Sequence, residues 1–323
     1  MSEFRSVNVR TGARLHLGLL ETRAPFRGVG LMIDRPATDI TIRTAEVDQV
    51  IDLRGRTLPA DHPLARRVQA VVVRFRAWCH ENLSQLVPAV DTPLGAQVVT
   101  RPDPHTGLGT GTQLAMAVAA GLQRGFGCEI VADVLARQIA GRGARSAVGI
   151  QGFLRGGFIC DLADPLRYPV PSTWRFALLR PEGHQDRIWG ETENQRFAGP
   201  PAHHCSQRTD SLRHMLSELA ATVRVGDFQQ FAATVSRYNQ ISGGLFADSQ
   251  GGPYNGPAIT RLIQCLQEQG WEGVGQSSWG PTVFVCCPDQ TSAERLLAAP
   301  PAGIAQMEIA RPLNAAAQVT WNG

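Results

Sequence analysis

Residues 104–122 read PHTGLGTGTQLAMAVAAGL. Three glycines and two threonines crowd the first half of this stretch: Gly107, Gly109, Gly111, Thr110 and Thr112. The alanine-rich run after them predicts a helix from about 112 to 122 that packs closely against a sheet. A helix start carries unpaired N–H groups and partial positive charge, so the stretch predicts a loop that wraps an anion. A tight helix start without any ligand is the alternative, since glycines serve both purposes.

The chain contains no lysine, and all 31 of its basic side chains are arginine. A Walker A loop requires Gly-Lys before Ser or Thr, so this loop is not one. The spacing does not match G-x-G-x-x-G either. Any phosphate chemistry at this loop must therefore depend on backbone N–H groups, hydroxyls and arginine.

Composition limits the class of protein. At about 150 residues per domain, 323 residues predict two domains, and an apolar content of 43% is typical of a globular core. A net charge of +3 with scattered arginines argues against a nucleic-acid partner. The N-terminus does not resemble a secretory signal, and no apolar run approaches the roughly 20 residues of a membrane span. We therefore expect no membrane partner.

Seven cysteines, an odd number without a C-x-x-C pair, favour free thiols and a cytoplasmic location. Cys286 and Cys287 lie in the apolar run VFVCC and are expected to be buried filler. His203, His204 and Cys205 are consecutive but match no zinc pattern. A loop is favoured for those three residues, and a metal role stays open.

Hydrophobic periodicity predicts strands and helices in both halves of the chain. The predicted strands are residues 5–20, 37–47, 94–102, 156–164, 173–181, 281–287 and 303–311. The predicted helices are residues 61–79, with Asp61 as N-cap, and 112–122, 131–140, 210–223, 227–238, 257–270 and 291–299. This mixture predicts two layered domains with separate cores, residues 1–170 and 171–323.

The segment PHTGLGTGTQLAMA resembles the second motif of the GHMP kinase superfamily, P-x-x-x-G-L-G-S-S-A. Thr110-Gly111-Thr112-Gln113 stands where the common form has Ser-Ser-Ala-Ala. This departure resembles one branch, the β-ribofuranosylaminobenzene 5′-phosphate synthases. Four further stretches are similar to that branch: ARLHLGLLE (13–21), GRGARSAVGIQGFLRGGFICD (141–161), QGGPYNGP (250–257) and GQSSWGPTVFV (275–285). The resemblance thus covers nearly the whole chain.

The resemblance implies an α+β fold of two domains. The first, residues 1–170, would be like domain 2 of ribosomal protein S5, and the second, residues 171–323, would be ferredoxin-like. It also implies a decarboxylating pentosyltransferase of tetrahydromethanopterin biosynthesis. Such an enzyme condenses phosphoribosyl pyrophosphate with 4-aminobenzoate or 4-hydroxybenzoate and releases CO₂ and pyrophosphate. No γ-phosphoryl group is transferred, and arginine forks suit phosphates and carboxylates, so a lysine is dispensable.

The family motifs assign phosphate binding to two segments. The residues are Gly107, Gly109, Thr110, Gly111, Thr112 and Gln113 in the glycine loop, and Arg142, Arg145 and Ser146 in the segment 141–146. The two arginines follow a predicted helix end, where a cation also interacts favourably with the helix dipole. A solvated helix-end cation is therefore the alternative for each, and as binding residues they could contact the benzoate carboxylate instead of a phosphate.

Arg14 and His16 alternate along a predicted strand and so share one face. Within the N-terminal signature, Arg14 is a candidate substrate anchor and His16 a candidate catalytic acid or base, although strand histidines are usually packed. Asp161 is a candidate catalytic residue and Mg²⁺ ligand, and capping a turn is an equal alternative.

The polar cluster near the C-terminus holds the candidate substrate-binding residues Gln276, Ser277, Ser278 and Trp279. An indole ring between hydroxyls suits a flat arene and a phosphate, whereas a buried Trp279 with a satisfied N–H is the alternative.

The implied reaction releases pyrophosphate, whose charge Mg²⁺ and arginines would neutralise. The arene carbon that bears the carboxylate attacks C1 of the ribose, and loss of CO₂ restores aromaticity. Two other functions stay open, an ATP-dependent small-molecule kinase of the same superfamily and a non-catalytic binding module. A homodimer is expected because it is the commonest closed assembly.

Overall fold

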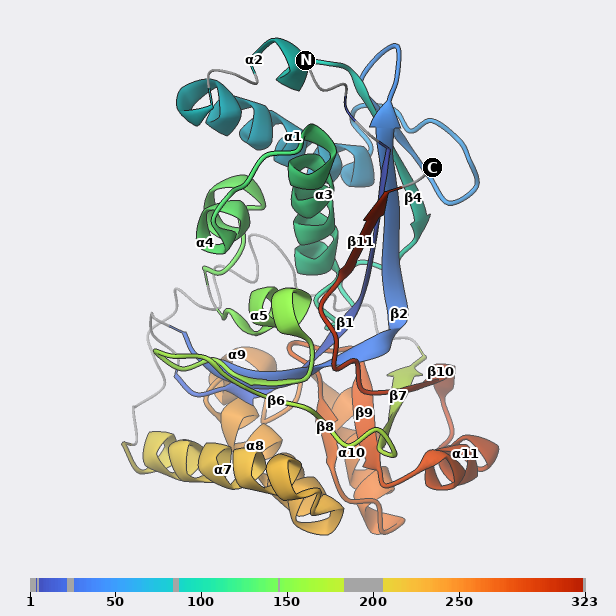
Figure 1. The fold of residues 1–323 in the computed structure, drawn as a ribbon. Helices are drawn as coiled ribbons and strands as arrows, with labels where there is room; N and C mark the ends of the chain where they lie inside the picture. The colour runs from blue at the N-terminus through green and yellow to red at the C-terminus, as the bar shows by residue number, and fades with distance from the viewer. Residues whose placement is uncertain are drawn as a thin grey trace.

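The computed structural model describes residue 4 and residues 6–21, 26–83, 87–144, 146–182 and 206–321. Two sheets, each covered by helices, make up this part of the chain (Figure 1). The first is antiparallel except where its strands at 49–51 and 94–100 pair in parallel, and the second is wholly antiparallel. The predicted residues Arg145, His203, His204 and Cys205 lie outside the described residues.

The first sheet is built on a long antiparallel pair, β1 (Val7–Leu19) and β2 (Gly28–Thr44). Its other strands are β3 (Gln49–Ile51), β4 (Leu94–Thr100), β5 (Phe158–Cys160), β6 (Leu166–Tyr168) and β11 (Gln318–Trp321). The helices of this half are α1 (Pro63–Asn82), α2 (Val87–Val90), α3 (Thr110–Phe126), α4 (Ala132–Val134), the π-helical turn η2 (Leu135–Ile139) and α5 (Val148–Arg155). Helices α1 and α3 lie on the same side of the sheet (Figure 1).

The second sheet has the order β10-β7-β9-β8, and all its neighbours are antiparallel. Its strands are β7 (Arg175–Pro181), β8 (Val274–Gln276), β9 (Val283–Cys287) and β10 (Ile304–Ala310). Its helices are α7 (Ser206–Val225), α8 (Phe228–Gly244), α9 (Ala247–Gln250), α10 (Pro257–Glu268) and α11 (Gln290–Ala298). Helices separate β7 from β8 and β9 from β10, which is the ferredoxin-like arrangement that was expected.

The last strand returns to the first sheet. β11 pairs antiparallel with β1, with Val7 opposite Trp321 and Arg10 opposite Gln318. Residues 318–321 therefore belong to the first sheet, although the predicted second domain includes them. The chain crosses twice between its two sheets.

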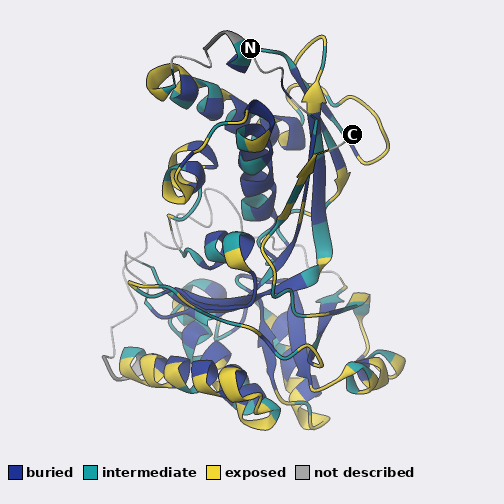
Figure 2. Cartoon of the chain, viewed as in Figure 1, coloured by how far each residue is buried: buried dark blue, intermediate teal, exposed yellow. Residues whose placement is uncertain are grey.

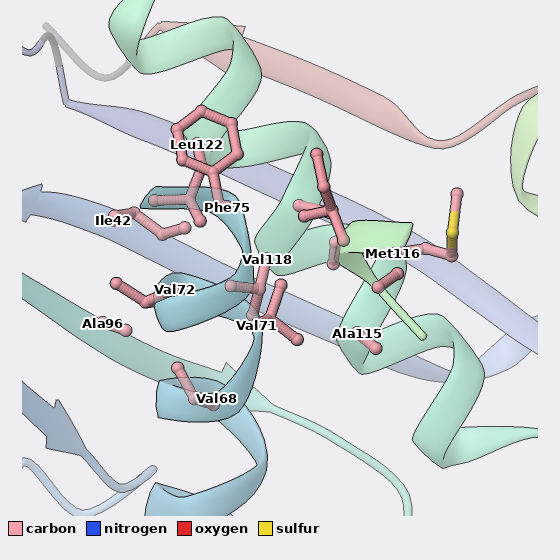
Figure 3. Close-up of a cluster of buried hydrophobic side chains, with 14 of the residues drawn as sticks. Ile42, Val68, Val71, Val72, Phe75, Ala96, Ala115, Met116, Val118 and Leu122 are labelled. Atoms are coloured by element: carbon pink, nitrogen blue, oxygen red, sulfur yellow. The ribbon is translucent and has the colours of Figure 1, made fainter. Parts of the chain in front are cut away.

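A first core lies between α1, α3 and the first sheet, and Figure 3 shows part of it. On α1, Val68, Val71 and Phe75 recur at helical spacing and are almost completely buried. Gly121 of α3 faces β2 so closely that an added Cβ would lie 2.9 Å from Cδ1 of Ile42. Truncation of a buried aromatic such as Phe75 to alanine typically costs about 3–5 kcal/mol.

A second core joins the two halves. Leu15 and Leu31 of the first sheet pack in one cluster with Leu216 of α7, Phe231 of α8 and Phe284 of β9. The buried faces of both sheets turn toward helices, and the exposed faces of α1 and α7 turn outward (Figure 2). Because this core is shared, residues from both halves can contribute to one site.

Most of the predicted elements are present, although some boundaries differ and several short strands and helices were not predicted. Helix α1 is capped by His62, whose Nδ1 accepts a hydrogen bond from the Leu64 N–H at 3.2 Å, so the prediction of Asp61 as N-cap was wrong. Helix α3 begins at Thr110, two residues before the predicted start. Helix α5 was missed because two of its eight residues are glycine, and packing of Ile150 and Phe153 outweighs that low propensity.

Candidate active site

A cavity of about 630 Å³ is lined by residues from both halves of the molecule. Its walls come from β1, the glycine loop at 107–112, residues 141–144 and 146, helix α8 and the turn at 276–280. Twelve of the predicted site residues line it: Arg14, His16, Gly107, Gly109, Thr110, Gly111, Thr112, Arg142, Ser146, Gln276, Ser278 and Trp279. Gln113, Asp161 and Ser277 do not.

The glycine loop is held in shape by left-handed glycines. Gly107 has φ +80° and Gly109, the N-cap of α3, has φ +71°. A Cβ on Gly107 would lie 2.2 Å from the carbonyl oxygen of Ser277, so only glycine fits there. The N–H groups of Thr110 and Gly111, the first two of α3, have no intrahelical carbonyl, and both residues line the cavity.

Two guanidinium groups lie beside this helix start. A Cβ on Gly109 would lie 3.2 Å from Nε of Arg14, and one on Gly111 would lie 3.6 Å from Nη2 of Arg142. The backbone N–H of Arg14 also donates to the Leu108 carbonyl at 3.0 Å, which ties β1 to the loop. Two arginines and the positive end of a helix thus converge on one region, which favours an anionic ligand.

The segment 141–146 follows the π-helical turn η2. The N–H of Arg142 donates to the Ala136 carbonyl at 2.8 Å, so the turn fixes where this arginine leaves the helix. Single π-helical turns of this kind are frequent at functional sites. Ser146 accepts from the Val148 N–H at 3.2 Å and also lines the cavity.

Asp161 supports this segment from outside the cavity. Its carboxylate accepts from the Ala147 N–H at 2.6 Å and is also hydrogen-bonded by Ser146. Burial raises the pKa of the Asp161 carboxyl, and these hydrogen bonds oppose the rise. The contacts match the capping alternative, in which Asp161 orders the start of α5.

Gln113 is likewise engaged within the fold. It is completely buried, its Oε1 accepts from the Thr11 hydroxyl at 2.8 Å, and its Nε2 donates to the Gly149 carbonyl at 2.9 Å. The side chain therefore links β1, α3 and α5. A family motif match at this position does not distinguish such a link from a ligand contact.

His16 is 4% exposed and carries its ring at the cavity wall. Burial lowers the pKa of His16 well below its usual value, and the charge of Arg14 lowers it further. Its Nδ1 has no hydrogen-bond partner among the described residues. The ring is therefore a neutral imidazole at neutral pH, which is the form required of a general base.

Ser277 joins three parts of the site. Its hydroxyl accepts from the His16 N–H at 3.0 Å and donates to the Gly107 carbonyl at 2.9 Å. It is completely buried. Ser277 thus holds β1, the glycine loop and the turn at 276–280 in contact.

The remainder of the turn faces the cavity. Gln276 accepts from the Asn255 N–H at 2.7 Å and donates to the Ser278 carbonyl at 2.7 Å. Ser278 has φ +56°, an uncommon value for a residue other than glycine. The ring of Trp279 meets that of Phe246 edge to face, with centroids 5.2 Å apart. This end of the cavity is aromatic, whereas the helix start is cationic.

Several other residues that line the cavity belong to no predicted site. Asn239 on α8 donates to the carbonyls of Leu17 at 2.6 Å and Gln276 at 2.9 Å, and Phe246 follows the same helix. No sequence pattern distinguishes either of them from ordinary helix residues. Arg67 on α1 and His105 before the glycine loop also line the cavity. Gln250 and Pro253 belong to the stretch QGGPYNGP, whose similarity to a family motif was the available signal.

The donor set does not fit a metal ion held by the protein. No aspartate or glutamate is among the described residues that line the cavity. Within the described ranges there is also no group of three or more His, Cys, Asp or Glu side chains that could hold a metal. Mg²⁺ prefers carboxylate and phosphate oxygens. The cavity wall instead offers N–H groups, hydroxyls and guanidinium groups, which suit an anion.

The chain is similar in sequence to a known family and to several named proteins. Residues 215–304 match the family described as GHMP kinases C terminal. A β-ribofuranosylphenol 5′-phosphate synthase of Methanothermobacter thermautotrophicus is 25% identical over 305 residues, which are 85% of this chain and 87% of that protein. One from Archaeoglobus fulgidus is 25% identical over 159 residues, 48% of this chain and 44% of that protein.

Solved structures of similar shape cover almost the whole chain. Homoserine kinase of Cytophaga hutchinsonii aligns with a TM-score of 0.65 at 15% identity and covers 99% of each chain. Mevalonate diphosphate decarboxylase of Staphylococcus aureus aligns with a TM-score of 0.70 at 12% identity and covers 98% of each. At such identities these likenesses establish the fold alone.

The chain therefore has the two-domain α+β fold of the GHMP kinases, and residues 215–304 match their C-terminal family. In sequence, the chain is similar to the β-ribofuranosylphenol 5′-phosphate synthases, in agreement with the resemblance of its N-terminal and central motifs. None of the helices in the described part of the chain combines the length and apolar character of a membrane span.

Proposed function

We propose that this chain is a decarboxylating phosphoribosyltransferase. It would condense phosphoribosyl pyrophosphate with 4-hydroxybenzoate or 4-aminobenzoate, in the biosynthesis of a methanopterin-type carrier. The main support for the proposal is that one cavity has a cationic end and an aromatic end. Arg14 and Arg142 flank a helix start that contains no lysine, and Trp279 and Phe246 form an aromatic end.

The chemistry follows from these two ends. Arg14, Arg142 and the start of α3 would stabilise the charge that develops on the leaving pyrophosphate as its bond to C1 of the ribose breaks. The arene carbon that bears the carboxylate forms the new bond to C1. The bond between ring and carboxylate then breaks, its electron pair restores aromaticity, and CO₂ leaves. The lining has aromatic and small polar groups at the Trp279 end, which would leave the carboxylate weakly held, as decarboxylation requires.

The acceptor is proposed to be 4-hydroxybenzoate in preference to 4-aminobenzoate. The curated relatives are named for a ribosylated phenol, which is the product that 4-hydroxybenzoate would give. A neutral His16 also suits a phenol acceptor, because removal of the phenolic proton pushes electron density onto the attacking carbon. An aniline nitrogen already donates its lone pair and needs no base.

Mg²⁺ is proposed to enter as a complex with the pyrophosphate of the donor, since the described cavity wall supplies no carboxylate. The protein alone should then bind Mg²⁺ weakly in equilibrium dialysis, and phosphoribosyl pyrophosphate should increase the binding. Turnover should stop in EDTA and return with added Mg²⁺. Tight Mg²⁺ binding by the protein alone would contradict this order of assembly.

One assay tests the main proposal. Carboxyl-labelled 4-hydroxybenzoate and 4-aminobenzoate are incubated with the protein, with and without phosphoribosyl pyrophosphate, and labelled CO₂ is measured. Release that depends on phosphoribosyl pyrophosphate and not on ATP is expected. ADP formation with an alcohol substrate would establish the kinase alternative instead. Binding of phosphoribosyl pyrophosphate without turnover of either acid would establish a binding module.

A further inference from the structure

A second pair of polar side chains, Arg67 and His105, lies at the cavity, and of the two only His105 falls within a family motif. Arg67 belongs to α1 and His105 precedes the glycine loop, and both side chains line the cavity. Nη2 of Arg67 lies 3.0 Å from Nε2 of His105. A guanidinium group can only donate, so Nε2 of His105 accepts, and the neutral ring carries its proton on Nδ1.

This pair is rich in donors. The bond to His105 is the only hydrogen bond of the Arg67 side chain among the described residues, and it uses one of five guanidinium N–H groups. Four donors of Arg67 thus have no partner in the described protein. A cavity wall with such an excess of donors is complementary to an anion with several oxygens.

Charge balance around the pair supports the same conclusion. Arg101 lies near enough to Arg67 that the charge of Arg67 lowers the pKa of Arg101, after the larger effect of burial. The carboxylate of Asp103 partly opposes this effect on the pKa of Arg101, but it is shared with Arg180, whose Nη1 lies 3.1 Å from Oδ2. Like charges are therefore held together beside the cavity, and a bound anion would offset their repulsion.

The backbone of His105 is also strained. His105 has φ +62°, in the left-handed region that residues with a Cβ rarely adopt. Such a conformation costs on the order of 1–3 kcal/mol and persists where the surroundings fix it, often at ligand sites. Here it brings the ring against Arg67.

We infer that Arg67 and His105 form a second anion subsite, which binds the 5′-phosphate monoester of the sugar-phosphate donor. The inference rests on the proposed function, because phosphoribosyl pyrophosphate carries a phosphate monoester at C5 and a pyrophosphate at C1. The helix start with Arg14 and Arg142 binds the pyrophosphate, and the Arg67–His105 pair binds the monoester. Together they orient C1 of the ribose relative to the acceptor.

Calorimetric titration with separate probes tests the assignment. Wild type, Arg67→Gln and Arg66→Gln are titrated with ribose 5-phosphate, inorganic pyrophosphate, ADP and phosphoribosyl pyrophosphate. Arg66 is an exposed neighbour on the same helix, so it controls for charge and helix stability. Arg67→Gln should weaken ribose 5-phosphate and phosphoribosyl pyrophosphate by about tenfold to a hundredfold. Its affinity for inorganic pyrophosphate should stay within about twofold of wild type, and Arg66→Gln should leave all four affinities unchanged.

A second variant removes the ring without adding strain. His105→Asn keeps a residue that tolerates positive φ and should weaken ribose 5-phosphate in the same direction. Unchanged binding of ribose 5-phosphate by Arg67→Gln, or failure of wild type to bind it, would overturn the inference. Equal losses for pyrophosphate would mean a single shared subsite, and a loss confined to ADP would assign the pair to a nucleotide. Each of these results also contradicts the inference.

The proposed function and this inference fail in different ways. If labelled CO₂ is released but Arg67→Gln has the wild-type KM for phosphoribosyl pyrophosphate, only the subsite is wrong. If ribose 5-phosphate binding depends on Arg67 but no CO₂ is released from either acid, the subsite holds and the proposed reaction is wrong.

Discussion

The cavity is bounded by two short segments of similar composition, the glycine loop at 107–112 and the turn at 276–280. Both place hydroxyl groups between glycines. The loop presents its backbone, because left-handed Gly107 and Gly109 bring the start of α3 to the cavity wall. The turn instead uses its side chains to hold the fold, since Ser277 and Gln276 hydrogen-bond to neighbouring backbone groups.

The difference shows that a polar side chain in a motif can serve either the ligand or the scaffold. Ser277 and Ser278 are adjacent and chemically identical, yet Ser277 is completely buried and Ser278 lines the cavity. The loop binds through atoms that every residue has, so its glycines matter more than its hydroxyls. In the turn, the side chains themselves matter. Substitutions confined to the loop or to the turn can therefore distinguish ligand binding by the backbone from support of the fold by side chains.

The largest effect is expected from Gly107→Val. The new Cβ would meet the Ser277 carbonyl at 2.2 Å, and valine resists φ +80°, so the two segments could not remain in contact. We expect kcat/KM to fall by at least about a thousandfold, through loss of both the phosphate loop and the arene side of the site. Steady-state kinetics with phosphoribosyl pyrophosphate as the varied substrate measures this.

Gly127→Val is the matched control for that variant. Gly127 ends the same helix with φ +67°, but a Cβ there would meet nothing within 4 Å. It should lower the free energy of unfolding by about 1–2 kcal/mol through backbone strain and leave kcat/KM near wild type. Similar losses of activity in both variants would mean that helix strain, and not contact between loop and turn, controls the site.

Arg14→Gln is expected to have the next largest effect. Arg14 lies beside Gly109, and removing its charge should reduce kcat/KM by about tenfold to a hundredfold, as for one charge-assisted hydrogen bond. Arg10→Gln on the same strand is the control, because Arg10 is exposed and 3.6 Å from Asp39. If Arg10→Gln reduced activity as much as Arg14→Gln, general charge and not position would explain the loss.

Substitution of the adjacent serines Ser277 and Ser278 should have smaller effects, and it tests which of them holds the turn in place. Ser277→Ala removes the partner of two buried backbone groups and should lower the free energy of unfolding by about 1–3 kcal/mol in urea denaturation. Ser278→Ala should change that free energy by less than about 0.5 kcal/mol but raise the KM for substrate. The reverse pattern would mean that Ser278, and not Ser277, holds the segments together.

Sequence patterns predicted the fold well where one signal dominated. The periodic run 61–79 and the glycine loop followed local rules, and their elements are present. The ferredoxin-like half, which the family resemblance implied, is present too. Helix α5 and strand β11 could not be predicted locally. The glycines of α5 disfavour a helix until Phe153 packs into the core, and β11 exists only because its chain end meets the edge of β1.

The site was predictable in its segments but not in the role of each atom. Motif resemblance located twelve lining residues, because backbone geometry and ligand chemistry constrain such segments together. It also selected Gln113, Asp161 and Ser277, whose side chains bond within the fold. Arg67 and Phe246 were missed, since they reach the cavity only through the packing of α1 and α8. Tertiary arrangement decides both kinds of difference.

The smallest expected effect concerns His16, which lies where β1 meets both segments. Burial, and then the charge of Arg14, lower the pKa of His16 in the folded protein well below its ordinary value of about 6.5. The unfolded chain then binds a proton that the folded chain does not. Stability from this residue is therefore complete above about pH 6.5 and is lost as the pH falls toward the folded pKa.

Between pH 7.5 and 5.5, wild type should lose roughly 1 kcal/mol more of its free energy of unfolding than His16→Gln. His214→Gln, which changes an exposed histidine of α7, should lose as much as wild type. Parallel losses in wild type and His16→Gln would mean that His16 is protonated in the fold, and the turn and loop would then meet at a cation instead of a neutral base.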